Sequence, residues 1–179
     1  MRFLVVGGLA VNAHGYLRLT ADIGLVIALD PANIHTAFEA LAGIGYRPSV
    51  PIRAEEFADA GLRKRWQREK GMQVLNFFSD RRPETSVDLF VHEPFDFAAE
   101  YRAALTAELR PGLPVRFVSI PTLIRMKEAA GRAIRTTSST CAGSSKTGGR
   151  YEQPIAASLR SPPCAARIVA PWSRHYGRE

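Results

Sequence analysis

Apolar and polar residues alternate along two separate stretches of the chain, 22–29 and 85–91. A period of two is typical of a β-strand that buries one face and leaves the other accessible. The apolar rows are Ile23, Leu25 and Ile27 in the first stretch and Val87, Leu89 and Val91 in the second. Asp22 and Asp88 fall on the opposite faces. We therefore predict two strands, each presenting one carboxylate away from its apolar row.

The remaining pattern alternates between strand-like and helix-like segments. Asp30-Pro31 is a good helix start, because Asp caps a helix N-terminus and Pro suits the first helical position. Strands are predicted at 3–6, 72–78 and 115–118, an extended segment at 46–52, a turn at 80–84, helices at 9–16, 31–41, 95–109 and 121–132, and partial helix at 55–70. In the last helix we expect Leu123, Ile124 and Met126 to face inward. This interleaving predicts an α/β (α+β) fold, a mixed sheet with helices packed on it.

The composition changes abruptly after Arg132. Residues 136–149 are rich in Ser, Thr and Gly, and the prolines that follow show no periodicity. We therefore predict one domain at 1–132 and a disordered basic tail at 133–179. A second hypothesis is that the tail is a frameshift product. Synonymous codons for 133–150 exist that, read one nucleotide early, spell an acidic, Leu-rich helix.

Charge and cysteine also differ between the two parts. Residues 1–132 hold 17 basic and 15 acidic residues, whereas 133–179 hold 7 and 2, so the basic character belongs mostly to the tail. Both cysteines, Cys141 and Cys164, lie in the tail, which argues against a disulfide framework or a cysteine zinc site in the domain. No apolar run approaches the roughly 18 residues of a membrane span. We expect a cytoplasmic protein that does not enter a membrane.

A glycine pair follows the first predicted strand. Gly7 and Gly8 would let backbone N–H groups approach an anion, although any strand–helix turn can use glycine. Asp22, at the start of the next strand, could hold a divalent cation beside that anion. Neither a G-x-G-x-x-G motif nor a Walker lysine is present, so a Rossmann or P-loop site lacks its fingerprint.

These residues resemble a known family. Gly7-Gly8, His14-Gly15, Arg18, Thr20, Asp22-Ile23 and Val87-Asp88-Leu89-Phe90-Val91 look like motifs of the small prokaryotic nucleotidyltransferases of the polymerase-β-like superfamily. The similarity is greatest to the abortive-infection and toxin–antitoxin branch, and it runs from about residue 3 to residue 132.

The resemblance implies a fold, an activity and a set of site residues. It implies transfer of a nucleoside monophosphate from an NTP to a hydroxyl acceptor, with two Mg²⁺ ions clamping the reacting oxygens. The acceptor can be RNA, protein or a small molecule. By the same resemblance, Gly7 and Gly8 form the triphosphate loop, Arg18 and Thr20 contact phosphates, and Asp22 and Asp88 are the catalytic metal ligands.

One position departs from the family. The family has Asp-x-Asp where this chain has Asp22-Ile23-Gly24, and glycine has no side chain with which to bind a metal. Loss of an outer-shell partner costs roughly 10- to 100-fold, so loss of a ligand should cost at least about 100-fold. The alternative is a catalytically dead module that binds a nucleotide or a cognate protein, such as half of a toxin–antitoxin pair. A third reading is sequence error, since one base change converts Asp to Gly.

Other candidate residues keep two interpretations each. Arg18 is either a phosphate contact or a surface charge, and Thr20 is either a phosphate contact or a strand-start cap. His14 is better explained by a structural hydrogen bond, and neither His35 nor His92 has a partner at ligand spacing. The basic cluster at 63–70, with Trp66 embedded, either steers a nucleic-acid or nucleotide substrate or is a solvated helix face.

Overall fold

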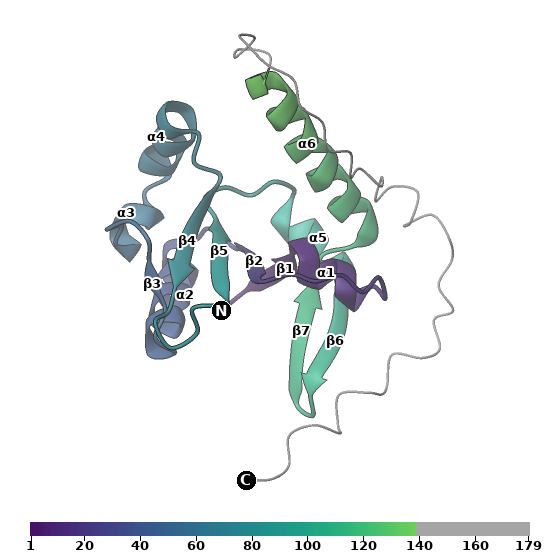
Figure 1. Ribbon diagram of the computed structural model, residues 1–179. Helices are drawn as coiled ribbons and strands as arrows, with labels where there is room; N and C mark the ends of the chain where they lie inside the picture. The colour runs from purple at the N-terminus through teal and green to yellow at the C-terminus, as the bar shows by residue number, and fades with distance from the viewer. Residues whose placement is uncertain (139–179) are drawn as a thin grey trace.

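The computed structural model describes residues 1–138 as a seven-stranded mixed sheet with helices packed against it (Figure 1). The strands are β1 (Phe3–Val6), β2 (Asp22–Ile27), β3 (Arg47–Pro48), β4 (Val74–Phe78), β5 (Ser86–Phe90), β6 (Leu105–Arg110) and β7 (Leu113–Phe117). The helices are α1 (Gly7–Ala13), α2 (Pro31–Gly43), α3 (Ala54–Ala58), α4 (Ala60–Lys70), α5 (Phe97–Ala103) and α6 (Ile120–Ser138). The predicted mixed α/β class is confirmed.

The strand order places the two carboxylate-bearing strands side by side. The sheet runs β3-β4-β5-β2-β1-β7-β6. β2 is parallel to β5, and β1 is parallel to β7, whereas the other neighbours are antiparallel. Because β2 and β5 are adjacent, side chains on one face of both strands can act on the same ligand.

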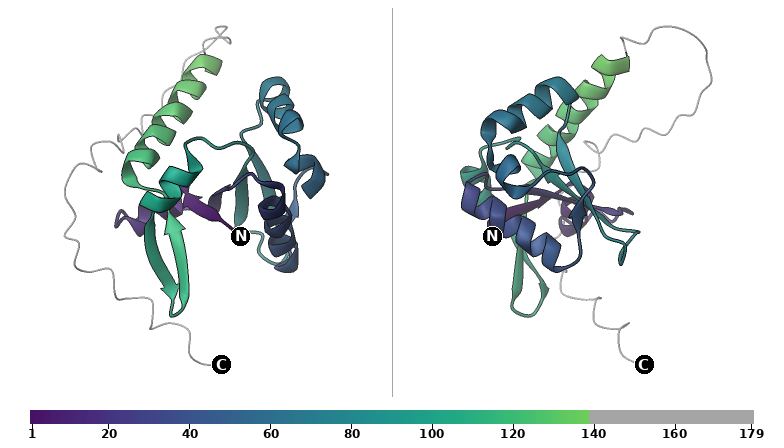
Figure 2. Two further views of the ribbon diagram at one scale, coloured as in Figure 1. Left: turned by 180° about the vertical axis from the view of Figure 1, so that it is seen from behind. Right: turned by 90° about the vertical axis from the view of Figure 1, so that its left-hand side faces the viewer.

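The helices gather in two groups. α2, α3 and α4 lie at the β3–β4 end of the sheet, and α1, α5 and α6 lie toward the β7–β6 end (Figures 1 and 2). Under the first group, the ring of Phe38 packs against the rings of Phe57 and Phe77, with centroids 5.4 Å and 5.2 Å away. α2 begins where predicted, because the Asp30 side chain accepts a hydrogen bond from the backbone N–H of Asn33.

The helix predicted at 95–109 is wrong in its second half. α5 ends at Ala103, and Leu105–Arg110 forms β6, which pairs with β7 in an antiparallel hairpin. Gly112 in the turn has φ +77°, a conformation that favours glycine. Leu105, Ala107 and Leu109 do alternate with polar residues, and pairing with β7 selects this period of two over the helical one.

Other boundaries differ by a few residues. α1 covers Gly7–Ala13 rather than 9–16, and the segment at 55–70 divides into α3 and α4 at Asp59. α6 continues to Ser138, six residues into the predicted tail. The rest of that tail, on which the predicted disorder and most of the frameshift hypothesis fall, lies outside the described residues. No helix in residues 1–138 is long and apolar enough to cross a membrane.

Candidate active site

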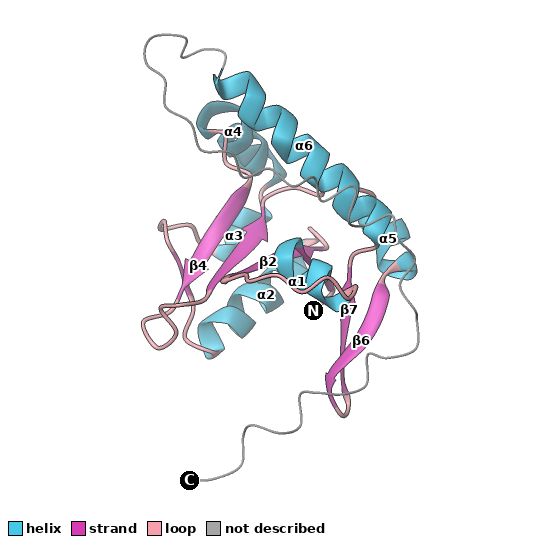
Figure 3. Ribbon diagram, turned by 45° about the vertical axis from the view of Figure 1, so that its right-hand side comes forward, coloured by secondary structure: helices cyan, strands magenta, loops and turns pink. Residues whose placement is uncertain are grey.

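A cavity of about 330 Å³ lies among the sheet, α1 and α6, and Figure 3 shows α6 running above α1 and the middle of the sheet. Its walls include every candidate site residue chosen from the sequence. The lining is Val6, Gly7, Gly8, Val11, Arg18, Thr20, Asp22, Gly24, Val74, Asp88, Phe90, Leu123, Met126, Lys127 and Ala130. Residues separated by up to 81 positions in the candidate set, from Gly7 to Asp88, thus share one cavity wall.

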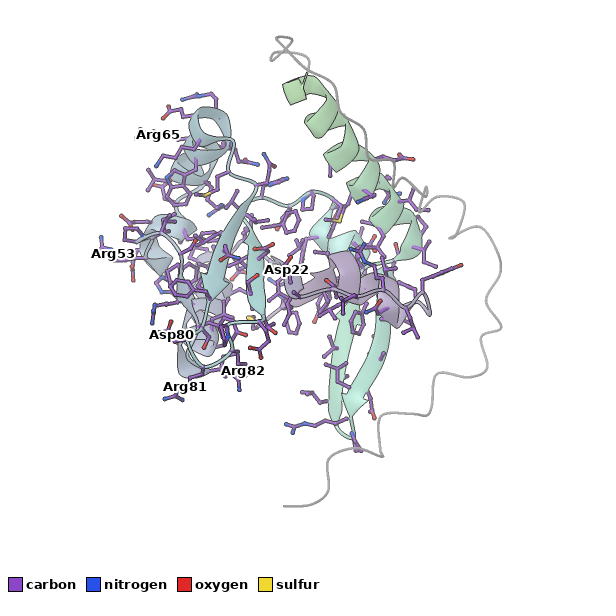
Figure 4. All side chains as sticks on the ribbon, in the orientation of Figure 1. Asp22, Arg53, Arg65, Asp80, Arg81 and Arg82 are labelled. Carbon is purple, nitrogen blue, oxygen red and sulfur yellow. The ribbon has the colours of Figure 1, made fainter. Side chains whose placement is uncertain are left out.

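The two carboxylates stand on neighbouring strands. Asp22 is in register with Ser86, and Gly24 is in register with Asp88. Asp88 is therefore displaced by two residues along the sheet from Asp22, with roughly 8 Å between their Cα atoms from standard strand spacings. Figure 4 shows Asp22 between β5 and α1. Their common position in the cavity wall suits ligands that share a cation or a chain of phosphates.

Each carboxylate is oriented by a neutral neighbour. The Ser86 hydroxyl donates to Asp22 Oδ1 at 2.8 Å, and Asn76 Nδ2 donates to Asp88 Oδ1, also at 2.8 Å. Both donors come from strands of the same sheet, so the pleat fixes their direction. The second oxygen of each aspartate has no such partner among the described residues, and it is available to a cation.

Each glycine of the pair is favoured by its surroundings, Gly7 by its backbone conformation and Gly8 by a close neighbour. Gly7 has φ +70°, in the left-handed region that favours glycine. A β-carbon added at Gly8 would lie 2.5 Å from Thr20 Oγ1. The absence of that carbon lets the Thr20 side chain lie directly against the loop, beside Gly7 and Gly8 in the cavity wall.

The segment between α1 and β2 is held by one amide side chain. Asn12 Nδ2 donates to the Arg18 carbonyl at 3.1 Å, and the Arg18 N–H donates to Asn12 Oδ1 at 2.9 Å. This paired bond fixes the backbone of Arg18 at the edge of the cavity. The Thr20 hydroxyl also donates to the Asp22 carbonyl at 3.3 Å, which fits the strand-start interpretation as well.

His14 takes the structural role that its sequence position suggested. Its Nε2 lies 2.8 Å from the carbonyl oxygen of Val118, just after β7. The ring thus connects the end of α1 to the segment before α6. His14 is absent from the cavity lining.

Gly24 is closely covered by the neighbouring strand. It pairs with Val6 of β1, and a β-carbon at Gly24 would lie 2.9 Å from Val6 Cγ2. The valine methyl therefore occupies the space in which a second aspartate would begin. In the described part of the chain, no group of three or more His, Cys, Asp or Glu side chains is placed to hold a metal ion. These residues therefore suit one cation held by two carboxylates better than two cations held by three carboxylates.

Two polar residues of the site were not predicted from the sequence. Lys127 reaches the cavity from α6, on the helix face formed by Leu123, Met126, Lys127 and Ala130. Leu123 is buried and Met126 is half-buried against the core, as expected, whereas Ile124, also half-buried, is not among the residues that pack against the core. Asn76 was missed because its role depends on cross-strand pairing with Asp88. Lys127 lies three or four residues from Leu123 and Ala130 along α6, and this helical spacing could have placed it on the same face from the sequence alone.

Comparison with known proteins adds no family assignment. No protein-family model matches this chain, and a search of curated proteins finds no match.

Proposed function

We propose that this cavity binds a Mg²⁺–NTP, and that the chain slowly transfers a nucleoside monophosphate from it to a hydroxyl acceptor. The observation that supports the proposal most strongly is the gathering of Gly7, Gly8, Arg18, Thr20, Asp22 and Asp88 in one cavity. A glycine loop, a cation and two carboxylates in one cavity suit a triphosphate with its metal.

Each part of the cavity has a role in this proposal. Gly7 and Gly8 bring the backbone close to the phosphates, and Arg18 and Lys127 balance their negative charge. Asp22 and Asp88 would hold Mg²⁺, which polarises the α-phosphate and neutralises the pyrophosphate leaving group. The acceptor oxygen attacks the α-phosphorus, the bond to the β-phosphate breaks, and Asp88 accepts the hydroxyl proton. The glycine at position 24 makes this transfer slow.

A second function is favoured by the same glycine. If two carboxylates hold the cation without clamping both reacting oxygens, the chain is a nucleotide-binding module that does not transfer. A cognate protein would then respond to the bound nucleotide, as in a toxin–antitoxin pair. Both functions require Mg²⁺–NTP in the cavity, so NTP binding is tested first.

Equilibrium dialysis with each of the four common NTPs tests the binding step. We expect wild-type protein to bind at least one NTP in Mg²⁺, with affinity at least about tenfold weaker in Asp22→Asn and Asp88→Asn. Asp80→Asn is the matched control, because Asp80 is exposed, pairs with Arg47 and lies away from Asp22 (Figure 4). NTP binding that survives both site substitutions unchanged would refute the proposed site.

A further inference from the structure

A second cavity, of about 570 Å³, lies where β2 and β5 end and where α4 and the start of α5 meet them. It shares no lining residue with the candidate active site. Its lining is Arg2, Ala28, Leu29, Asp30, Ala60, Arg63, Lys64, Gln67, Val91, His92, Glu93, Asp96, Phe97 and Ala98. A volume in this range is that of small-molecule sites.

One face of α4 forms the basic wall of this cavity. Ala60, Arg63, Lys64 and Gln67 follow the spacing of three, four and seven residues that places side chains on one helix face. Arg65, in contrast, is exposed on the outer side of α4 (Figure 4). The basic cluster noted in the sequence is therefore divided, and only part of it faces a cavity.

Arg63 is a buried cation that uses little of its bonding capacity. The residue is only 8% exposed, its guanidinium lies 5.8 Å from the centre of the Phe57 ring, and the one hydrogen bond of its side chain in the described residues goes from Nη1 to the Phe57 carbonyl. It forms no ion pair within the described part of the chain, and burial lowers its pKa against the opposing effect of Asp59 and Glu93. A guanidinium has five N–H donors, so most of them remain for a ligand.

His92 supplies a second uncommitted polar group. Its Nδ1 is buried and has no hydrogen-bond partner in the described residues. Burial also lowers the pKa of His92, so the ring is neutral at pH 7 and its Nδ1 can carry the proton. A buried polar atom without a partner is costly, and a ligand atom at this place would remove the cost.

The acidic residues of the cavity are already engaged. Asp30 accepts from Arg2 and from the Asn33 N–H, Glu93 accepts from the Leu29 N–H, and Asp96 accepts from the Ala99 N–H. By contrast, the described structure gives no side-chain partner to Lys64 or Gln67. The uncommitted groups of the cavity are thus mainly donors and cations.

We propose that this cavity is a second ligand site, which binds the phosphate or carboxylate group of a small metabolite through Arg63, Lys64 and His92. An oxyanion accepts hydrogen bonds from all three residues and gives Arg63 the direct ion pair that Asp59 and Glu93 do not form with it. This proposal does not depend on the proposed transfer reaction or on nucleotide binding in the candidate active site.

NMR of the histidine rings tests the proposal on the full chain. Inorganic phosphate and succinate, titrated separately against chloride of equal ionic strength, distinguish a phosphate site from a carboxylate site. We expect at least one of them to shift the His92 ring signals saturably. His35, which lies on α2 beside Glu55 and lines neither cavity, is the internal reference and should stay unshifted.

Substitutions on α4 provide the decisive comparison. Lys64→Met should weaken the His92 response about 5- to 10-fold in affinity, which corresponds to one charge-assisted hydrogen bond that is partly exposed. Arg65→Met, on the same helix but outside the cavity, should leave it unchanged. A non-saturable shift with both anions, a shift at His35 alone, or equal affinities in Lys64→Met and wild type would overturn the proposal.

Discussion

Gly8 and Gly24 each face a neighbour that leaves no room for a β-carbon, and both neighbours line the candidate active site. At Gly8 the neighbour is Thr20, whose Oγ1 and Cβ would lie 2.5 Å and 2.7 Å from an added carbon. At Gly24 it is Val6, whose Cγ2 would lie 2.9 Å away. The first contact brings Thr20 against the Gly7-Gly8 loop, whereas the second fills the space that a side chain at position 24 would need.

We predict that Gly8→Ala destabilises the protein by about 1–3 kcal/mol, because the new methyl group overpacks against Thr20. NTP binding should weaken as Thr20 is displaced. Gly43→Ala is the matched control, since a β-carbon there meets nothing within 4 Å, and it should be neutral or slightly stabilising. Urea unfolding of both variants makes the comparison, and equal free energies of unfolding would contradict the close contact at Gly8.

At the scale of elements, α5 holds the start of α6 through one buried carboxylate. Glu100 is 8% exposed, and its two oxygens accept from the Ser119 N–H at 2.6 Å and from the Thr122 hydroxyl at 2.7 Å. Arg125 donates to the same hydroxyl at 2.6 Å. Since α6 supplies Lys127 to the candidate site, this connection also positions one wall of the cavity.

The pKa of Glu100 leads to a prediction about pH. Burial raises this pKa, but hydrogen bonds from Thr122 and Ser119, together with the charge of Arg125, outweigh burial and hold it below its ordinary value of 4.5. The folded state therefore gains stability from ionised Glu100 above pH 4.5, and loses it as the pH falls through the lowered pKa.

Glu100→Gln should cost about 1–3 kcal/mol at neutral pH, because it removes a charged acceptor from two buried donors. The difference in free energy of unfolding between the variant and the wild type should become smaller as the pH falls below 4.5. Urea unfolding at several acidic pH values measures this difference. The other carboxylates titrate in both proteins, so their contributions cancel in the difference. A difference that stays constant with pH would show that Glu100 does not act through its charge.

Local sequence patterns predicted β5 correctly and β6 wrongly, because only the β6 segment needs its pairing partner to decide between two periods. The alternation around Val87 and Leu89 is undisturbed, and β5 forms where it indicates. The segment at 105–110 carries both a helical and a strand period, and only pairing with β7 decides between them. A single-sequence pattern contains no information on that distant partner.

At the scale of the whole molecule, the candidate site depends on pairings between distant segments. Alternation alone placed Asp22 and Asp88 on the exposed faces of two strands, but it could not show that β2 and β5 are neighbours. The resemblance to nucleotidyltransferases supplied that expectation. The contact of the Val6 side chain with Gly24 could not be predicted from the sequence, because it follows from the antiparallel register of β1 and β2.

The two cavities lie in separate regions of the molecule. One lies under α6 with the candidate metal ligands, and the other lies beside α4 with a buried arginine. A nucleotide bound in the first cavity and an oxyanion in the second would contact different strand ends and different helices. We therefore expect substitutions in one cavity to leave binding in the other intact.

The proposed nucleotidyl-transfer site is weakened by the lack of one carboxylate. Gly24→Asp combined with Val6→Ala restores the carboxylate and removes the methyl group that blocks it. Pyrophosphate release from Mg²⁺–NTP reports transfer to any hydroxyl acceptor, water included. Val6→Ala alone is the control for the enlarged cavity.

We predict that the double variant releases pyrophosphate at least about tenfold faster than both wild type and Val6→Ala. Tenfold is the lower limit of the roughly 10- to 100-fold effect expected from changing a group that supports a metal. The rate should depend on Mg²⁺ and should return to the wild-type level when Asp88→Asn is added. A folded double variant that binds Mg²⁺–NTP but releases pyrophosphate no faster than wild type would contradict the claim.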